Sequence, residues 1–272
     1  MLAALAVVLS LLPQSSPAFR AWNEPIEPFR VAGPLYYVGP KDITSLLVTT
    51  SDGHVLIDGG LEESAPIVIA NIARLGFRIE DVKVLLSTHA HADHAGGLAR
   101  LKAASGAQLY AGAPDVELLE RGGRGDFAFG DTLPFPPVKA DVGVREGQEV
   151  ALGGVRFRAV ATPGHTKGCT TWTFTIDDNG VQRRVVMVGG TTAPGYRLVN
   201  NASYPRIVED FEETFRRLRS LEGDIVFEGH GFAFALEARR QGKRPFVDPA
   251  ALRESVDRAE AAFRKALGEQ SR

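Results

Sequence analysis

The sequence has little cysteine, no excess of positive charge and none of the common catalytic sequence motifs. Cys169 is the single cysteine among 272 residues, so neither an internal disulfide framework nor a cysteine-rich zinc module is available. The 31 basic and 33 acidic side chains give a formal net charge of −2, which argues against nucleic acid as a partner. A P-loop, a Rossmann glycine pattern, an HExxH run and a G-x-S-x-G run are all missing. What is present is an ordinary globular composition, 44% apolar and 24% charged, with enough apolar residues for a core.

An apolar run, Leu2–Leu12, stands at the start of the chain. It has about the length of the hydrophobic region of a secretory signal and is too short to span a bilayer comfortably. Ser16 and Ala18 place small residues at positions −3 and −1 of a cleavage site after Ala18. We therefore expect a signal peptide over 1–18 and one mature domain over 19–272, periplasmic or secreted by a bacterium, without stable membrane association after cleavage. No lysine or arginine precedes the run, so a buried N-terminal helix or an uncleaved anchor remains the alternative.

Strand-like and helix-like segments alternate twice along the remaining chain. Short runs rich in Val, Ile, Leu and Tyr predict strands, and apolar residues at helical spacing predict helices. The expected strands cover residues 35–38, 45–49, 54–58, 82–87, 155–161, 170–176, 181–188 and 224–227. One expected helix begins at Ser64, and the others cover 95–104, 115–121, 207–221 and 249–267. This order favours an α/β fold, with two sheets and helices outside them, over an all-β sandwich.

Three of the six histidines lie in one short run, His89-Ala-His91-Ala-Asp93-His94. His89 and His91 leave the end of a predicted strand together and can converge on one cation, while Asp93 and His94 can face a neighbouring position. Imidazole and carboxylate groups suit Zn²⁺ and related cations. The alternative is a polar loop in which Asp93 caps the following helix. Four potential ligands within six residues are difficult to explain in that way.

Two further histidines, His165 and His230, stand just after predicted strands and beside glycines. Either one alone is more typical of a surface or core histidine. Together with the cluster they become candidate ligands, because loops above rigid strands are the usual place to build a site. His54 is expected at the surface, and Cys169 is expected to be a small buried residue rather than a thiolate ligand.

Six candidate ligands divide naturally into two sets of three. Three protein ligands leave open positions on a zinc ion, as catalytic rather than structural sites do. Two such ions about 3.5–4 Å apart can share one water and lower its pKa towards 7, which supplies hydroxide without a serine or cysteine nucleophile. One ion polarises the attacked carbonyl, and the other takes the charge of the departing group. The sequence therefore predicts a hydrolase.

The run at 89–94 followed by Gly96-Gly97, with the later His165 and His230, resembles the metallo-β-lactamase superfamily. This resemblance implies a four-layer αββα sandwich, in which two mixed sheets carry helices on their outer faces and a di-metal site lies at the strand ends. Further stretches are similar to the third subclass of class B β-lactamases, the di-zinc branch without a cysteine ligand. They are residues 34–39, 53–58, 168–172, 193–196 and 204–210. The resemblance covers most of residues 22–240.

The resemblance also implies the cofactor, two Zn²⁺ ions per chain, and the role of each ligand. The residues carried over to the first ion are His89, His91 and His165. Those carried over to the second ion are Asp93, His94 and His230. A bridging hydroxide would attack the amide carbonyl of a β-lactam, and Asp93 would pass a proton to the departing ring nitrogen. The implied activity is a β-lactamase (EC 3.5.2.6) that acts on penicillins, cephalosporins and carbapenems and confers antibiotic resistance. We expect a monomer with this small molecule as its partner.

One position departs from the superfamily pattern. The chain reads Gly189-Gly190-Thr191-Thr192 where glyoxalase II-like thioesterases and ribonuclease Z-like nucleases have a bridging Asp and the first two lactamase subclasses need a Cys. The absence of an acid argues against those branches. The third subclass typically has Ser near this point and uses nearby hydroxyls to hold the substrate carboxylate. We expect Thr191 or Thr192 to take that task, and Tyr196 to contact substrate as well.

Two other functions stay open at this point. One is hydrolysis of another ester, lactone or thioester by the same fold, and the other is zinc binding without catalysis. An export signal favours the β-lactamase, because β-lactams act outside the cytoplasmic membrane.

The loop Gly122–Pro137 carries three phenylalanines, Phe127, Phe129 and Phe135. It is long enough and apolar enough to be a mobile flap that covers a substrate. Alternatively, the three rings anchor the loop to the core.

Overall fold

The computed structural model describes residues 17–272, and its first helix, α1, spans Pro17–Trp22. The predicted signal peptide therefore lies, except for Pro17 and Ala18, outside the described residues. Within the described part of the chain, no helix combines the length and the apolar character needed to cross a bilayer.

A seven-stranded sheet takes its strands from the first half of the chain, in sequence order. They are β1 (Phe29–Ala32), β2 (Leu35–Tyr37), β3 (Leu46–Thr50), β4 (Gly53–Ile57), β5 (Val82–Leu86), β6 (Gln108–Gly112) and β7 (Val142–Val144). Strands β1 to β4 pair antiparallel, whereas β4 to β7 pair parallel. Parallel neighbours need a crossover, and helices α2 (Ser64–Arg74), α4 (Leu98–Ser105) and α5 (Val116–Glu120) lie in those connections.

A five-stranded sheet takes its strands from the second half, in the order β12-β11-β10-β9-β8. They are β8 (Glu149–Leu152), β9 (Val155–Ala161), β10 (Thr170–Asp178), β11 (Val181–Met187) and β12 (Ile225–Phe227). β8 to β11 are antiparallel, and β10 turns into β11 at Asn179-Gly180, where both residues have positive φ. β12 joins β11 in parallel after the crossover helix α6 (Ile207–Arg219).

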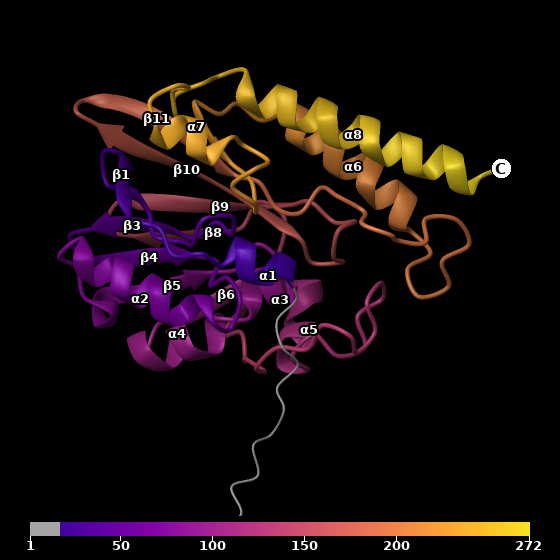
Figure 1. The fold of residues 1–272 in the computed structure, drawn as a ribbon, viewed down its shortest axis with the longest axis horizontal. Helices are drawn as coiled ribbons and strands as arrows, with labels where there is room; N and C mark the ends of the chain where they lie inside the picture. The colour runs from indigo at the N-terminus through magenta and orange to yellow at the C-terminus, as the bar shows by residue number, and fades with distance from the viewer. Residues whose placement is uncertain (1–16) are drawn as a thin grey trace, which may run out of the picture.

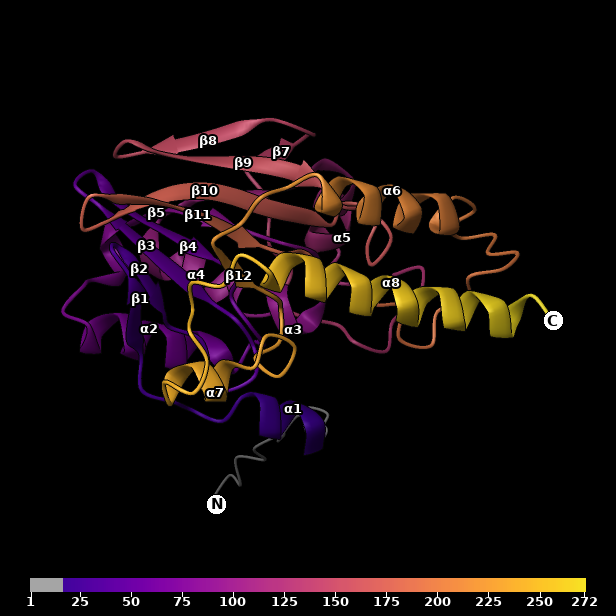
Figure 2. The same ribbon diagram turned by 90° about the horizontal axis from the view of Figure 1, so that it is seen from above.

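Helices cover the outer face of each sheet (Figure 1, Figure 2). α2 and α4 lie against the first sheet, and α6 lies beside the long C-terminal helix α8 (Ala251–Gln270) against the second. The remaining helices of the described chain are α3 (Ala92–Ala95) and α7 (Leu236–Arg240), and 3₁₀ turns lie at Ile79–Asp81 and Ala113–Asp115. This four-layer αββα arrangement of two mixed sheets confirms the predicted fold class.

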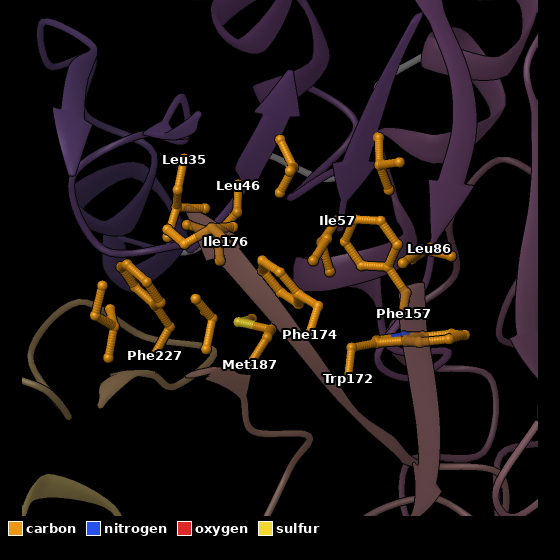
Figure 3. Packing of buried hydrophobic residues seen from close by; sticks show 14 of the residues in the cluster. Leu35, Leu46, Ile57, Leu86, Phe157, Trp172, Phe174, Ile176, Met187 and Phe227 are labelled. Atoms are coloured by element: carbon orange, nitrogen blue, oxygen red, sulfur yellow. The ribbon is translucent and has the colours of Figure 1, made fainter. Parts of the chain in front are cut away.

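The largest apolar cluster fills the space between the two sheets (Figure 3). Trp172 of β10 is fully buried there, and its Nε1 donates a hydrogen bond of 3.0 Å to Ser87 O, two residues before His89. Each large apolar side chain buried in this way contributes about 1.5–3 kcal/mol to stability. Two further clusters lie under α2 and α4 and under α6 and α8. The strands that end near the histidines therefore belong to a rigid platform.

The strands and helices expected from the sequence are all present, with ends that differ by a few residues. Four strands, β1, β6, β7 and β8, were not predicted. They are three to five residues long, too short to show a clear alternation, and β8 is recognisable mainly by its pairing with β9 across Gly153-Gly154.

Two single-residue expectations have opposite outcomes. Cys169 is buried, as predicted, at 1% exposure. The surface position predicted for His54 is wrong, because the turn ends at Asp52 and His54 already belongs to β4, where it is buried. Its ring packs edge-on against Phe77, with ring centroids 5.0 Å apart.

Candidate metal centre

The predicted ligands all follow the carboxyl ends of strands. The segment with His89 and His91 follows β5 and leads into α3, which carries Asp93 and His94. His165 lies in the connection from β9 to β10, and His230 comes three residues after β12 ends at Phe227. Strands from both sheets therefore deliver these side chains to one place, although the segments are far apart in sequence.

Two overlapping clusters of ligand atoms form there. One ligand atom each of His89, His91 and His165 lie within 4.8 Å of one another, and so do those of His89, Asp93 and His94. His230 joins the second cluster through Asp93, whose Oδ2 lies 3.4 Å from His230 Nε2 and 3.7 Å from His94 Nε2. We call His89, His91 and His165 the first group, and Asp93, His94 and His230 the second group.

Hydrogen bonds orient two rings of the first group. Thr88 Oγ1 gives its proton to Asp58 Oδ2 at 2.6 Å, so at 3.0 Å it accepts one from His89 Nδ1. His165 Nδ1 donates to Thr192 O at 2.6 Å. In both residues the proton on Nδ1 leaves a lone pair on Nε2, the atom that faces the cluster.

The second group is oriented in the same way. His94 Nδ1 donates to Asp58 Oδ2 at 3.2 Å, and His230 Nδ1 donates to Asp42 O at 3.0 Å. Their Nε2 atoms are then free to bind and point towards Asp93. Asp58, at the end of β4, holds a left-handed φ of 60°, a strained conformation for a residue other than glycine. One buried carboxylate thus braces both groups.

His91 is turned the other way round. Its Nδ1 lies 3.1 Å from His165 Nε2, inside the cluster. Its Nε2 points out towards the carboxylate of Asp126, 3.6 Å from Oδ2, a distance beyond a hydrogen bond.

The donor set fits a divalent metal of the zinc type. His89 Nε2 is buried and has no hydrogen-bond partner among the described residues, as expected of an atom that awaits a cation. Burial, together with neighbouring histidines, lowers the pKa of His89 and brings that of His165 to about 3. Both rings are therefore neutral at physiological pH, the form in which imidazole binds metal.

The second group carries charge instead. Burial raises the pKa of Asp93, but His94 and His230 outweigh it and hold the pKa well below its usual value. For His94, burial lowers the pKa, but Asp93 and Asp58 outweigh it and raise the pKa above the usual value. The carboxylate of Asp93 is thus ionised, and a metal bound by His94 replaces a proton that the surroundings favour.

A second buried carboxylate, Asp115, ties the two ligand loops of the first group together. It accepts hydrogen bonds from Ala90 N at 3.0 Å, from Thr166 Oγ1 at 2.6 Å and from Gly168 N at 2.7 Å. The segment that carries His89 and His91 is thereby joined to the segment that carries His165.

Gly190 and Gly229 each make room for a histidine ring, and Gly189 makes room for Cys169. These close approaches explain the unusual Gly189-Gly190 pair. A Cβ atom at Gly190 would lie 2.1 Å from the His165 ring, and one at Gly229 would lie 2.6 Å from the His94 ring. A Cβ at Gly189 would meet Cys169 Sγ at 2.7 Å. An acid, a cysteine or a serine at Gly190 therefore requires a different position of His165.

The three predicted substrate contacts occupy different surroundings. Thr191 is buried, at 6% exposure, whereas the side chain of Thr192 is exposed and its carbonyl orients His165. Tyr196 is buried, its ring is stacked on His165, and its hydroxyl donates to His165 O at 3.0 Å. Of the three, Thr192 has the side chain that a substrate can reach in this structure.

The loop Gly122–Pro137 is attached to the core by its phenylalanines, which favours anchoring over free movement. Phe135 is buried against the first sheet's outer cluster, and Phe127 and Phe129 pack against the cluster under α6 and α8. The Phe129 ring lies edge-on to His91, with centroids 5.2 Å apart. The loop therefore covers part of the first group.

Sequence reasoning missed three carboxylates that support the ligands: Asp58, Asp115 and Asp126. Asp58 had a visible signal, since an acid at the end of an otherwise apolar strand is costly unless it has partners. Asp115 and Asp126 lie in a helix start and a loop, where acids are common, so nothing local distinguishes them.

The sequence of this chain is similar to that of known proteins. Residues 38–230 match the family described as the metallo-beta-lactamase superfamily. Among curated proteins, a hydroxyacylglutathione hydrolase of Rhodopseudomonas palustris is 30% identical over 196 residues, which cover 72% of this chain and 65% of that protein. The chain thus spans slightly less than two thirds of that relative.

Among solved structures the similarity extends over almost the whole chain. A Cronobacter sakazakii metallo-beta-lactamase with a HARLDQ motif has a TM-score of 0.90 and 42% identity, with 93% of this chain and 99% of that chain covered. The subclass B3 metallo-beta-lactamase BJP-1 of Bradyrhizobium japonicum has a TM-score of 0.87 and 36% identity, with 93% and 98% covered. This chain reads HAHADH at residues 89–94.

Proposed function

The chain belongs to the metallo-beta-lactamase superfamily, and on that premise we propose that it is a zinc-dependent β-lactamase, which hydrolyses the amide bond of β-lactam antibiotics. One observation carries the proposal: six nitrogen and oxygen ligands converge in two groups, and four of the five histidines have their outward-facing ring nitrogen hydrogen-bonded to an oxygen. The similarity to solved β-lactamases over more than nine tenths of the chain supports this choice of substrate.

Two Zn²⁺ ions are proposed, one held by each group. When bound, zinc would polarise the carbonyl of the substrate and lower the pKa of a bound water to about 7. The protein's own part is to keep His89 and His165 neutral and fixed in one tautomer, so that their Nε2 lone pairs face inwards. Asp93, ionised at neutral pH, can accept a proton and deliver it to the departing ring nitrogen.

We further propose that the substrate carboxylate binds near Thr192, the exposed hydroxyl next to His165. Thr191 and Tyr196 lie in the same segment, but both are buried, and Tyr196 already donates its hydroxyl proton to His165 O. Thr192→Ala should therefore raise KM more than it lowers kcat, because it removes a contact to substrate and leaves the metal ligands in place.

The test of the proposed function is hydrolysis of a carbapenem and of a chromogenic cephalosporin by the purified protein, with and without EDTA. We expect cleavage of both drugs, loss of activity with the chelator, and recovery when zinc is added back. His89→Ala should abolish activity, since His89 lies in both clusters of ligand atoms. Two bound zinc ions without cleavage of either drug would refute the substrate but leave the metal site standing.

A thioester hydrolase is the second candidate, because several curated relatives are named hydroxyacylglutathione hydrolase. The chain lacks an acid at 189–190, and a side chain at Gly190 would displace His165, so a ligand at that position is unavailable here. Assay of a glutathione thioester alongside the two β-lactams separates the candidates directly.

We also propose that the protein is exported to the periplasm or the medium, and that it acts as a monomer without nucleic-acid or membrane partners. The proposal of export rests on the apolar run before Ala18 and on the site of action of β-lactams. N-terminal sequencing of the protein recovered from fractionated cells, followed by light scattering on a sizing column, tests both points. A start at Met1 in the cytoplasmic fraction would contradict export.

A further inference from the structure

Two buried atoms beside the first group face each other without a hydrogen bond. His91 Nε2 and Asp126 Oδ2 are 3.6 Å apart, and neither has a hydrogen-bond partner among the described residues. Their side chains are only 8% and 3% exposed. Buried donors and acceptors are normally paired, so two complementary unpaired atoms at this distance require an explanation.

The carboxylate of Asp126 is held in place and cannot turn away. Its Oδ1 accepts hydrogen bonds of 2.8 Å from both Ala128 N and Phe129 N. The backbone of Asp126 also exchanges two hydrogen bonds with Gly130, at 3.2 and 2.9 Å. The hydrogen bonds of the turn therefore occupy Oδ1, and Oδ2 faces His91 Nε2.

The surroundings keep water away from this pair. The Phe129 ring lies edge-on to His91 and also contacts Tyr196, with centroids 5.7 Å apart. Phe127 packs edge-on against Tyr196 and Tyr204. Because an ionised oxygen in such a place has no solvent partner, a proton on His91 Nε2 is the available donor that satisfies it.

We propose that Asp126 is a positioning residue for His91: its carboxylate accepts a hydrogen bond from Nε2, selects the tautomer that leaves Nδ1 free for a metal, and so couples the loop Gly122–Pro137 to the metal content of the first group. Each of the other four histidines among the candidate ligands has an oxygen acceptor on its outer nitrogen, and Asp126 supplies the one that His91 lacks. Coupling is reciprocal, so metal stabilises the loop and the loop raises metal affinity.

The rival explanation is that Asp126 only shapes its own turn. The two roles use different oxygens, because the turn needs Oδ1 and the histidine needs Oδ2. Asp126→Asn keeps an oxygen for the two backbone amides but presents an NH₂ group to His91 Nε2, so donor meets donor. Asp131→Asn is the matched control, since Asp131 lies in the same loop, is exposed, and accepts a hydrogen bond only from Gly125 N among the interactions described.

The experiment measures zinc affinity by competition with a chromophoric chelator, and hydrogen–deuterium exchange of residues 122–137 with and without zinc. In the wild type and in Asp131→Asn, zinc should slow exchange in the loop. In Asp126→Asn, one of the two ions should bind about ten- to a hundredfold more weakly, and the zinc-dependent protection should disappear. Wild-type affinity together with wild-type protection in Asp126→Asn would overturn the proposal and leave Asp126 as a turn residue.

Folding is checked by circular dichroism of the metal-free proteins. If Asp126→Asn does not fold, Asp126→Ser decides, because a serine oxygen can still accept from the turn amides and nothing replaces Oδ2. Loop exchange in the wild type that does not respond to zinc would also refute the coupling. The inference rests on the proposed zinc site but not on the substrate. A protein that binds zinc and cleaves no β-lactam would therefore refute the proposed function alone, whereas one that binds no zinc would refute both.

Discussion

The two ligand groups differ in burial and in charge, although they lie side by side. His89, His91 and His165 of the first group are at most 8% exposed and include no carboxylate. In the second group the side chains of Asp93 and His230 are 19% and 24% exposed, and Asp93 brings a negative charge. The first group is a closed set of nitrogen donors, and the second is a partly open set with one anion. Solvent therefore reaches the site mainly through the second group, while the first group is more deeply buried.

The largest effect is expected from removing one ligand of each group. His165→Ala and His230→Ala should each bind one zinc ion instead of two, and each should lose about a thousandfold in kcat, because each ion contributes several kcal/mol to stabilising the developing charge. Metal analysis of the dialysed proteins and steady-state kinetics check this. If either variant kept two ions, the division into two groups would be wrong.

A smaller effect is expected from adding one methyl group beside one histidine ring in each of the two groups. Gly190→Ala pushes on His165 and Gly229→Ala pushes on His94, at 2.1 and 2.6 Å from the new Cβ atom. We expect affinity for one ion to fall by about ten- to a hundredfold, in the first group for Gly190→Ala and in the second for Gly229→Ala. Gly268→Ala in α8, where a Cβ meets nothing within 4 Å, is the control. Chelator competition measures the affinities, and equal loss of both ions in both variants would contradict separate groups.

Acid should release metal from the second group before the first. Burial lowers the pKa of His94, but Asp93 and Asp58 raise it above the usual value, so protons compete with metal there as the pH falls through that raised pKa. His165, with a pKa of about 3, stays neutral far below that point. Zinc titrations at about pH 7.5 and pH 5.5 should therefore show one affinity falling much more than the other. A parallel fall of both would count against the charge difference between the groups.

The smallest effect concerns the support of the first group by the C-terminal helix. The Gln270 side chain donates to Tyr196 O at 2.8 Å and accepts from Leu198 N at 2.7 Å, and Tyr196 in turn holds the His165 backbone. Because these bonds are partly exposed, Gln270→Ala should cost only about 1 kcal/mol of unfolding free energy. Zinc release from the first group should be slightly faster, with the second unaffected. Denaturant unfolding and chelator kinetics measure both, against Glu269→Ala, an exposed neighbour.

Local sequence determined a large part of the fold and the centre of the site. The strand before His89 was visible because four of its five residues are apolar, and the run at 89–94 stands out because few structural roles need so many imidazoles together. The short strands β6, β7 and β8 were not visible, since three to five residues carry too little pattern and their pairing is with distant partners.

The supporting carboxylates show where sequence reasoning stops. Asp115 connects Ala90, which lies 25 positions before it in the chain, with Gly168, which lies 53 positions after it. Asp126 reaches His91 from a loop whose position depends on Phe127 and Phe129 packing against a different layer. Such contacts depend on how whole elements pack, and no spacing in the chain encodes them locally.

Short segments of the chain specify the ligand types, their grouping at strand ends and an α/β fold with helices outside two sheets, because side-chain chemistry and hydrophobic periodicity are local properties. The four-layer αββα order was expected only from the resemblance to the superfamily. The packing of distant segments sets which nitrogen of each ligand histidine faces inwards, why glycine is required at Gly190 and which carboxylates brace the rings. Those features depend on distances between residues far apart in the chain, and packing of the two sheets against each other and against their helices sets those distances.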